Sequence, residues 1–399
     1  MKSVDEQLAV IKRGVEQIER EDDLKRKLAA GKPLRVKFGI DPTSIDVHLG
    51  HTVPLRKLRQ FQELGHQAVL IIGNYTALVG DPSGRDQTRA RLTPEKVEQN
   101  ARDYLTQVSR IIDINRTEVT HNGDWFGKFN FLDVLSLTSK ITVQQLLARE
   151  DFANRHKAGT EIRLHECLYP LMQGHDSVAI RADIELGGTD QLFNMMVARD
   201  LQREAGQEAQ VCITFPILRG TDGVRRMGKS LGNYIGVGES AYDQFAKTMS
   251  IPDDLLREWF LLLTDRTEDE VNGLLAGHPM AAKKALARDI AAFYHGPEAA
   301  NAPQAEWERR FSEKQDPTEI PDAPIAAAKL TDGKLLIGKL LVEAGLAKSN
   351  NEGRRAVEGG GVTIGPDREK ITDPMANIAV TDGLILRVGK RNVVRLRVT

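Results

Sequence analysis

Residues 34–72 carry a pattern that few folds accommodate: a strand-like run, a helix-like run and a second strand-like run. The runs 34–40 (LRVKFGI) and 68–72 (AVLII) are short and rich in β-branched and other apolar side chains. Between them, residues 52–64 repeat large apolar side chains at helical intervals, with Pro54 where the first turn would lie. Because a helical crossover joins parallel neighbours, the sequence predicts a βαβ unit in a parallel sheet.

Apolar periodicity also predicts helices and strands in the rest of the chain and divides it into domains. It predicts a helix over 4–28, helices over 93–112 and 141–149, and a strand over 178–184. We therefore expect residues 1–220 to form one α/β domain, and residues 221–300 to form a loop followed by a region, 252–293, that is mostly helical. Four prolines and many charges then predict a linker over 301–332, with a separate small domain over 333–399.

Charge is unevenly distributed, although the 399 residues are close to neutral with 55 Lys and Arg against 56 Asp and Glu. Residues 335–399 carry 11 basic against 7 acidic residues, a net charge of +4. Residues 1–334 carry 44 against 49, a net charge of −5. A basic appendage on an acidic body is typical of a nucleic-acid contact, and a solvated basic surface is the alternative.

Composition also excludes some classes of protein. No apolar run approaches the roughly 18 residues needed to cross a bilayer, and the first ten residues hold acids where a signal peptide needs apolar residues. We therefore expect a cytoplasmic protein without membrane contact. The two cysteines, Cys167 and Cys212, form no CxxC pair, so we expect core thiols and neither a disulfide framework nor a protein-held metal.

The first candidate for chemistry is residues 41–51 (DPTSIDVHLGH), which follow the first predicted strand. In a parallel sheet, ligands bind beyond the carboxyl ends of strands, where a helix N-terminus offers free N–H groups to phosphate. Gly50 lets a flat base approach the backbone. His48 and His51 can donate hydrogen bonds to phosphate oxygens as charge develops on them. Surface or capping roles for the two histidines are the alternative.

The second candidate is residues 219–233 (RGTDGVRRMGKSLGN). Its glycines predict a mobile loop, and Arg226 and Lys229 are suited to clamp a polyphosphate. The segment GVRRMGKS also has the spacing of a P-loop, which is the competing interpretation. A P-loop follows a buried strand directly and opens a helix, whereas here residues 221–223 intervene and a Leu-Gly-Asn sequence breaks the helix at once.

Together with further blocks, these motifs resemble those of the bacterial tyrosyl-tRNA synthetases, which are class I aminoacyl-tRNA synthetases. HLGH is similar to the HIGH motif of that family, and RMGKS is similar to KMSKS. The other blocks are Gly73-Asn-Tyr-Thr76, Gly80-Asp-Pro-Ser-Gly84, Tyr169-Pro-Leu-Met-Gln-Gly-His-Asp176 and Gly187-Gly-Thr-Asp-Gln191. Residues 335–364 resemble an S4 RNA-binding domain. The resemblance implies a Rossmann-like doubly wound parallel sheet, a helical tRNA-binding domain over 221–300 and an α+β S4-like domain.

The resemblance implies a tyrosine–tRNA ligase, which makes tyrosyl-adenylate and pyrophosphate from tyrosine and ATP and then charges the 3′ end of tRNA(Tyr). The nucleophile of the first step is a carboxylate that is already ionised, so catalysis needs positioning and charge neutralisation rather than a general base. By resemblance, the catalytic residues are Thr43, His48, His51, Arg226 and Lys229. The ATP contacts are Gly50, Asp190, Lys229, Ser230, Arg85 and Arg89. Mg²⁺ would arrive with ATP.

Discrimination between tyrosine and phenylalanine depends on the substrate hydroxyl, and Asp176 is the predicted acceptor. Tyr169, Gln173 and Asp176 are spaced i, i+4 and i+7, so they share one helix face and can converge on one ligand. A polar face exposed to water is the alternative. By resemblance, the tyrosine-binding set is completed by Thr76, Asp81 and Gln191.

The sequence departs from the family pattern at four positions. Lys37 stands where many relatives place a tyrosine that contacts the substrate hydroxyl, so we expect that hydroxyl to rely on Asp176. Arg226 and Gly228 replace the first lysine and the first serine of KMSKS, so we expect Lys229 to be the main phosphate-binding cation of this motif. His175 stands where relatives often have an aromatic residue.

In the tail, residues 345–364 predict two short helices and a turn that offer Lys348, Arg354 and Arg355 to RNA phosphates. Residues 335–399 contain no Phe, Tyr or Trp, so we expect recognition of RNA shape and backbone rather than base stacking. The resemblance implies a homodimer, for which the apolar residues 131–147 suit an interface. Two other functions stay open: another HxGH-type synthetase or nucleotidyltransferase, and a non-catalytic RNA-binding relative of the synthetases.

Overall fold

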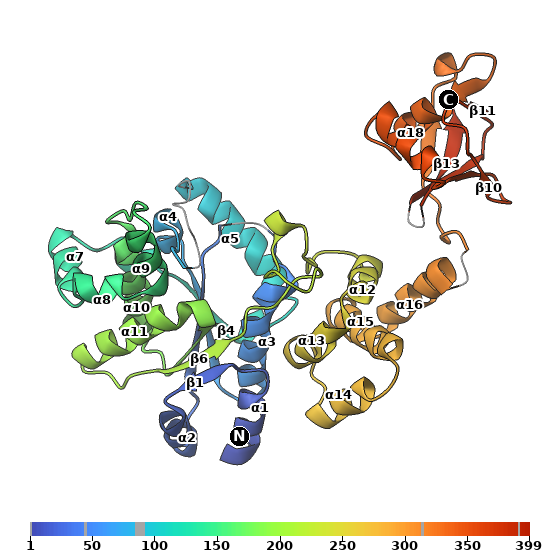
Figure 1. The fold of residues 1–399 in the computed structure, drawn as a ribbon. Helices are drawn as coiled ribbons and strands as arrows, with labels where there is room; N and C mark the ends of the chain where they lie inside the picture. Colours follow the sequence, from blue (N-terminus) through green and yellow to red (C-terminus); the bar gives the residue numbers. More distant parts are fainter. Residues whose placement is uncertain (1, 44–45, 84–91, 313–314, 390–391) are drawn as a thin grey trace. The chain divides into compact units, whose positions relative to one another are not determined.

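The chain forms two compact units, Met1–Pro297 and Glu298–Thr399, and each has its own hydrophobic core. The computed structural model describes residues 2–43, 46–83, 92–312, 315–389 and 392–399 (Figure 1). In the first unit, one core joins the predicted α/β and helical domains, because Val36 and Phe61 belong to the same cluster as Trp259. The structure therefore groups residues 1–220 and the helices up to 297 in one unit.

A six-stranded sheet in the order β1-β6-β5-β2-β3-β4 forms the centre of the first unit (Figure 1). Strands β2 to β6 run parallel, and β1 is antiparallel to β6. The chain goes from β2 outward to β3 and β4, then returns to β5 on the other side of β2, so the sheet is doubly wound as predicted. The strands are β1 Gln17–Glu19, β2 Arg35–Ile40, β3 Gln67–Ile72, β4 Thr117–His121, β5 Ile184–Gly188 and β6 Val211–Phe215.

The predicted βαβ unit is confirmed. Strands β2 and β3 pair in parallel from Arg35 opposite Gln67 to Ile40 opposite Ile72, and α3 (Leu49–Glu63) connects them. The helix begins three residues earlier than predicted, so Pro54 lies in its second turn rather than its first. Since proline has no N–H, it cannot donate the usual hydrogen bond to the carbonyl of Gly50, four residues earlier.

Two predicted elements are wrong. The helix over 4–28 is broken into α1 (Val4–Lys12), strand β1 and α2 (Glu21–Ala29), because Arg13 is extended and ends the first helix, and Gly14 then continues the turn with a φ of 69°. The strand over 178–184 is the end of α10 (Tyr169–Ile180), which terminates at Arg181 with a φ of 55°, followed by β5. A short apolar run is compatible with a buried helix face as well as with a strand, and in this structure its first residues belong to the helix.

The predicted helices over 93–112 and 141–149 and the mostly helical region 252–293 are confirmed. The remaining helices of the first unit are α4 Thr76–Val79, α5 Pro94–Val108, α6 Gly123–Phe126, α7 Phe131–Thr138, α8 Val143–Leu147, α9 Glu150–Lys157, α11 Leu192–Glu204, α12 Ala241–Met249, α13 Leu256–Leu263, α14 Glu268–Leu275 and α15 Pro279–His295. Among the described residues, no helix is long and apolar enough to span a bilayer. Cys212 is a buried core thiol as predicted, whereas Cys167 is half-buried in the turn before α10.

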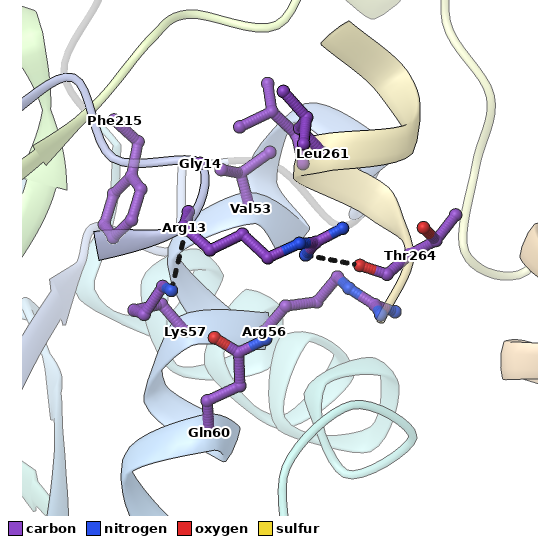
Figure 2. Close-up of a pocket in the computed structure, with 10 residues that line it drawn as sticks. Arg13, Gly14, Val53, Arg56, Lys57, Gln60, Phe215, Leu261 and Thr264 are labelled. Carbon is purple, nitrogen blue, oxygen red and sulfur yellow. Dashed lines mark hydrogen bonds between the residues drawn. The ribbon is translucent and has the colours of Figure 1, made fainter. Parts of the chain in front are cut away.

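Three cations, Arg13, Arg56 and Lys57, line a small cavity between α3, the segment after α1 and α13 (Figure 2). Lys57 Nζ donates to the carbonyls of Val10 and Arg13 at 2.7 and 2.9 Å. Arg13 in turn donates to two carbonyls at the end of α13, and Arg56 pairs with Asp265 at 2.8 Å. These contacts tie the N-terminal segment and the helical part to the helix that carries His51.

We predict that the buried Lys57 makes stability depend on pH. Burial removes water from the ammonium group and lowers its pKa to about 7, with a smaller contribution from Arg13. An unfolded chain has a lysine pKa near 10.4, so between about pH 7 and 10 the unfolded state binds more protons, and stability should rise with pH by up to about 1.4 kcal/mol per unit. Urea unfolding at pH 7.5 and 9 should show this rise in the wild type, and Lys57→Met should lack it. Parallel curves would refute the assignment.

The second unit contains a five-stranded sheet in the order β10-β9-β12-β13-β7 and a two-stranded sheet of β11 and β8. Its helices α17 and α18 pack together and contribute Leu340, Leu341 and Val357 to the core. The elements are α16 Asn301–Trp307, β7 Asp322–Ile325, β8 Lys334–Leu336, α17 Ile337–Glu343, α18 Asn350–Glu358, β9 Val362–Ile364, β10 Glu369–Lys370, β11 Asn377–Ala379, β12 Ile385–Val388 and β13 Asn392–Val398.

The predicted linker, 301–332, is in large part ordered secondary structure. It contains α16 and β7, and β7 pairs in parallel with β13. Pro324 is tolerated because β7 is an edge strand, so its missing N–H removes no hydrogen bond from a second neighbour. Asp316 also anchors this segment, since its carboxylate pairs with Arg368 at 2.9 Å and with Arg387. The fold of the tail therefore begins before residue 333.

Candidate active site

The carboxyl ends of β2 and β5 lie where the two halves of the sheet diverge, which is the usual ligand site of doubly wound folds. The segments after the parallel strands carry most of the predicted residues: Thr43, His48, Gly50 and His51 after β2, Thr76 and Asp81 after β3, Asp190 and Gln191 after β5, and Arg226, Lys229 and Ser230 after β6. The topology thus brings residues that are distant in sequence to one edge of the sheet.

The two predicted histidines lie together at the start of α3. Their rings stack with centroids 3.8 Å apart and planes 20° apart. His48 is buried, and because burial removes the water that would solvate an imidazolium ion, its pKa falls to about 3. A neutral imidazole donates one hydrogen bond, so His48 is able to stabilise charge that develops on a phosphate at neutral pH.

The two sequence motifs contact each other across almost 200 residues. Leu49 donates its N–H to the Ile235 carbonyl at 3.0 Å, and Val237 donates to Val47 at 2.8 Å. A side chain at Gly50 would lie 3.1 Å from the His48 ring and 3.6 Å from Met227 Cβ, so the glycine lets the two motifs approach each other at His48. Lys229 Nζ forms an ion pair with the Asp46 carboxylate. The predicted phosphate-binding groups therefore face one region.

The loop geometry excludes the P-loop interpretation of residues 223–230. Strand β6 ends at Phe215, well before Gly223, and Lys229–Leu231 form a single 3-10 turn rather than the start of an α-helix. The next helix, α12, begins only at Ala241. Such a loop lacks the row of helix N-terminal N–H groups that a P-loop presents to phosphate.

Hydrogen bonds connect three of the predicted tyrosine-binding residues. Tyr169 donates its hydroxyl to Asp41 at 2.9 Å, and Thr76 donates to the other oxygen of the same carboxylate at 2.6 Å. Asn122 Nδ2 then bridges Thr76 Oγ1 at 3.0 Å and the Asp176 carboxylate at 3.4 Å. Tyr169, Thr76 and Asp176 thus belong to one network, and Asp41 and Asn122 are the links.

A second network holds the other three. Asn194 Nδ2 donates to Gln173 at 2.8 Å and to Gln191 at 3.1 Å, and Gln191 donates to Asp81 at 2.9 Å. Asp81 also lies 3.6 Å from Arg149, which balances its charge. All six predicted tyrosine-binding side chains therefore have polar partners outside their own element, and Tyr169 and Asp176 on the helix face are buried, which contradicts the alternative of a polar helix face open to water.

Asp176 lies buried on α10, as the helical spacing requires. Burial raises the pKa of its carboxyl to about 7, opposed by the positive charge of Lys37 and by hydrogen bonds from Trp125 and Asn122. Trp125 Nε1 donates to Oδ1 at 3.0 Å. The carboxylate is therefore aimed by two donors from the segment after β4, which leaves its remaining lone pairs for a ligand donor.

Lys37 is fully buried and serves the protein rather than a ligand. Its ammonium group donates to the Gln173 carbonyl at 2.8 Å and to Ser177 Oγ at 2.7 Å, and it pairs with Glu185 at 2.8 Å. An ammonium group has three protons, so these contacts use all of its donors. The expectation that Lys37 gives no second contact to the substrate hydroxyl is consistent with this geometry.

His175 packs against two aromatic side chains, at the end of α6 and just after it. Its ring centroid lies 5.1 Å from that of Phe129 in an edge-to-face arrangement and 5.6 Å from that of Phe126. The imidazole thus takes the place of an aromatic residue in a packed cluster.

Some predicted residues are not part of these networks. Arg85 and Arg89 lie outside the described residues. Asp190, Arg226 and Ser230 are exposed, and Thr43 is half-buried, so all four are open to a ligand in solution. Among the described residues, no cluster of His, Cys, Asp or Glu is suited to hold a metal ion. The Mg²⁺ ion predicted to arrive with ATP stays a prediction.

Sequence reasoning missed several residues that order the site. Asp41 stands in the first motif but had no assigned role, and the links Asn122, Trp125 and Asn194 were not identified. Asn122 and Trp125 follow β4, a strand that was not predicted although its TEVTH sequence alternates weakly. Asn194 had no local signal, because its partners come from α10 and from the turn after β5.

In the second unit, the predicted RNA contacts lie in one short stretch. Lys348 precedes α18, and Arg354 and Arg355 belong to that helix. All three are exposed, and within the described part of the chain none of them forms an ion pair with an acidic side chain. The prediction of two helices over 345–364 was half right, since this range holds α18 and strand β9, and the other helix, α17, precedes it.

Comparison with known proteins places these features in context. A family model described as tRNA synthetases class I (W and Y) matches residues 29–312. The chain is 48% identical over 393 residues to the tyrosine–tRNA ligase of Aquifex aeolicus, with 98% of each chain covered. It is also 48% identical over 404 residues to that of Symbiobacterium thermophilum, covering 99% of this chain and 98% of the relative.

Solved structures share the fold. A C-terminally truncated mitochondrial tyrosyl-tRNA synthetase from Aspergillus nidulans superposes with a TM-score of 0.65 at 21% identity, covering 78% of this chain and 95% of that one. The tyrosyl-tRNA synthetase from Archaeoglobus fulgidus, solved with L-tyrosine, gives a TM-score of 0.62 at 23% identity, covering 75% and 99%.

Proposed function

We propose a function for this site from the premise that the chain belongs to the bacterial tyrosyl-tRNA synthetases, a class I family of aminoacyl-tRNA ligases. It activates tyrosine with ATP, which gives tyrosyl-adenylate and pyrophosphate, and then transfers the tyrosyl group to tRNA. The observation that supports this most is the pair of polar networks around Asp176 and Gln173 at the carboxyl ends of β2 and β5. A tyrosine placed there would find both a hydroxyl acceptor and carboxylates for its amino group.

The chemistry follows from the charges. The tyrosine carboxylate attacks the α-phosphorus of ATP without help from a base, and negative charge accumulates on the phosphate oxygens. His48 and His51 would donate hydrogen bonds to these oxygens, and Arg226 and Lys229 would neutralise the leaving pyrophosphate. Gly50 leaves space for the adenine base, and Asp190 would accept from the ribose. A magnesium ion bound to ATP would share the charge neutralisation.

An amino-acid-dependent pyrophosphate exchange panel tests this function. We expect exchange of label between pyrophosphate and ATP with tyrosine, and almost none with tryptophan or phenylalanine. Exchange driven by tryptophan, or a small-molecule substrate activated instead, would favour another nucleotidyltransferase. No ATP consumption with any amino acid would favour a non-catalytic RNA-binding relative.

We also propose that Lys348, Arg354 and Arg355 contact tRNA phosphates. Replacing all three by glutamate should leave tyrosine-dependent pyrophosphate exchange unchanged, because exchange needs no tRNA. The charging rate should fall and become less sensitive to salt, since each lost phosphate contact removes about 0.7–0.9 from the slope of log K against log salt. A chain truncated after Pro297, where the first unit ends, should behave likewise. Full-rate charging by either variant would refute the tail as a tRNA contact.

A homodimer is proposed on the basis of one exposed apolar surface. Phe131, Leu132 and Val143 on α7 and α8 are 74, 73 and 67% exposed, which is unusual for side chains of this size. A second copy of the chain would remove them from water. Sedimentation at micromolar concentration should give the mass of a dimer, and Phe131→Asp combined with Leu132→Asp should give a monomer. A monomeric wild type would refute the proposal. The cytoplasmic location stays a prediction.

A further inference from the structure

One buried amide organises the loop that carries the second motif. Asn233 is 3% exposed, although it lies among charged and exposed residues. Its Oδ1 accepts from the Gly228 N–H at 2.9 Å. Its Nδ2 donates to the Arg226 carbonyl at 3.1 Å and to the Asp222 carboxylate at 3.0 Å. The side chain therefore holds the backbone on both sides of Met227 and also the turn that precedes it.

Only one orientation of this amide satisfies its neighbours. The N–H of Gly228 needs an acceptor, whereas the carbonyl of Arg226 and the carboxylate of Asp222 need donors. The fit is also close in space, because a side chain at Gly220 would lie 2.3 Å from Asn233 Cγ. Only an amide of this size offers the acceptor and the donors at once in that place.

The segment that Asn233 holds is the one that presents the two predicted cations. Met227 is buried in the main core, and its N–H donates to the Leu218 carbonyl at 2.9 Å, so the centre of the segment is anchored. Arg226 and Lys229 flank this anchor, and both side chains are exposed on the outside. The direction in which they leave the loop depends on the backbone of residues 226–228.

We propose that Asn233 is a positioning residue for the nucleotide step: its amide fixes the backbone of residues 226–228 so that Arg226 and Lys229 meet the phosphates of ATP. This inference rests on the function proposed above. Asn233 itself reaches no substrate, and its effect passes through the two cations. It should therefore influence tyrosine activation by ATP and leave the binding of tyrosine alone unchanged.

The test measures the effect of one substitution, Asn233→Asp, in two versions of the full-length chain: one with and one without the cations Arg226 and Lys229. Asn233→Asp keeps the acceptor for Gly228 but turns the donor into a carboxylate oxygen that faces Asp222. It should lower kcat for pyrophosphate exchange about 10- to 100-fold, as expected when reacting groups are misplaced. In a chain that already carries Arg226→Ala and Lys229→Ala, the same change should cost less than about threefold, because effects that share one route are not additive. Tyrosine affinity, measured without ATP by equilibrium dialysis, should stay within about twofold of the wild type.

A second variant keeps the test valid if Asn233→Asp folds poorly. Gly220→Ala pushes a methyl group against Asn233 without altering any polar group and should reproduce the loss of kcat. Gly238→Ala is the matched control, because nothing lies within 4 Å of a side chain there, and it should leave exchange unchanged. Equal losses in both backgrounds, or a parallel loss of tyrosine affinity, would overturn the proposal. If the wild type itself lacked tyrosine-dependent exchange, the proposed function would fail instead.

Discussion

Replacing Asp176 by alanine should damage tyrosine activation and at the same time narrow the preference for tyrosine over phenylalanine. A site built to bind a substrate hydroxyl discriminates by roughly 10⁴–10⁵, because the analogue without the hydroxyl leaves a buried polar group unpaired. Asp176 is such a group, buried and aimed by Trp125 and Asn122. We expect the ratio of kcat/KM for the two amino acids to fall by about 5- to 150-fold or more, since an unpaired buried charge costs about 1–3 kcal/mol or more.

The pH dependence gives an independent measurement of the same carboxylate. Because burial raises the pKa of Asp176 to about 7, the carboxyl group of the free enzyme is protonated at pH 6 and ionised at pH 8. The ionised form accepts a hydrogen bond from the substrate hydroxyl, so kcat/KM for tyrosine should rise between pH 6 and 8 and then level off. Asp176→Asn should abolish this rise.

Two further variants serve as controls. Asp200→Ala removes an exposed carboxylate from α11 and should change neither the ratio nor the pH profile. Lys37→Ala is a control for specificity but not for stability, because removal of the lysine would leave Glu185 buried without its cation. Lys37→Ala should therefore lower stability, and any loss of activity should affect tyrosine and phenylalanine alike. If Lys37→Ala collapsed the ratio while Asp176→Ala kept it, the specificity assignment would be wrong.

The second large effect concerns the phosphates. His48→Ala and Lys229→Ala should each lower kcat for tyrosine activation by about 10²–10³, the loss typical of one electrostatic donor that acts in the transition state. The KM for tyrosine should change little, because the side chains meet the leaving group rather than the amino acid. Single-turnover formation of tyrosyl-adenylate measures this step without tRNA.

The control variants remove an imidazole and an ammonium group from exposed positions away from the site. His156→Ala on α9 and Lys128→Ala after α6 are exposed and should leave the rate unchanged. The pKa of His48 near 3 adds a second expectation, since its neutral form persists between pH 5 and 8 and the rate should show no titration of this group there. Adenylate formation at the wild-type rate in His48→Ala would contradict the assignment.

The sequence alone determined the elements whose signal is local. The strand-helix-strand pattern of residues 34–72 predicted β2, α3 and β3, because apolar periodicity depends only on near neighbours. It also predicted that the first motif follows a strand of a parallel sheet, and the sheet order then brings the second motif to the same edge. Tyr169, Gln173 and Asp176 were placed on one helix face by spacing alone, and α10 confirms that helix.

Only the tertiary structure decided which partners those residues have. Whether the run before β5 is helix or strand depended on the packing of α10. The chain turns after α1 through the extended Arg13 and through Gly14, where a side chain would meet the Leu261 carbonyl at 3.0 Å. The links Asp41, Asn122 and Asn194 were likewise invisible in the sequence. A buried polar group must find its hydrogen-bond partner somewhere in the fold, and nothing in the local sequence says which distant residue the topology will bring there.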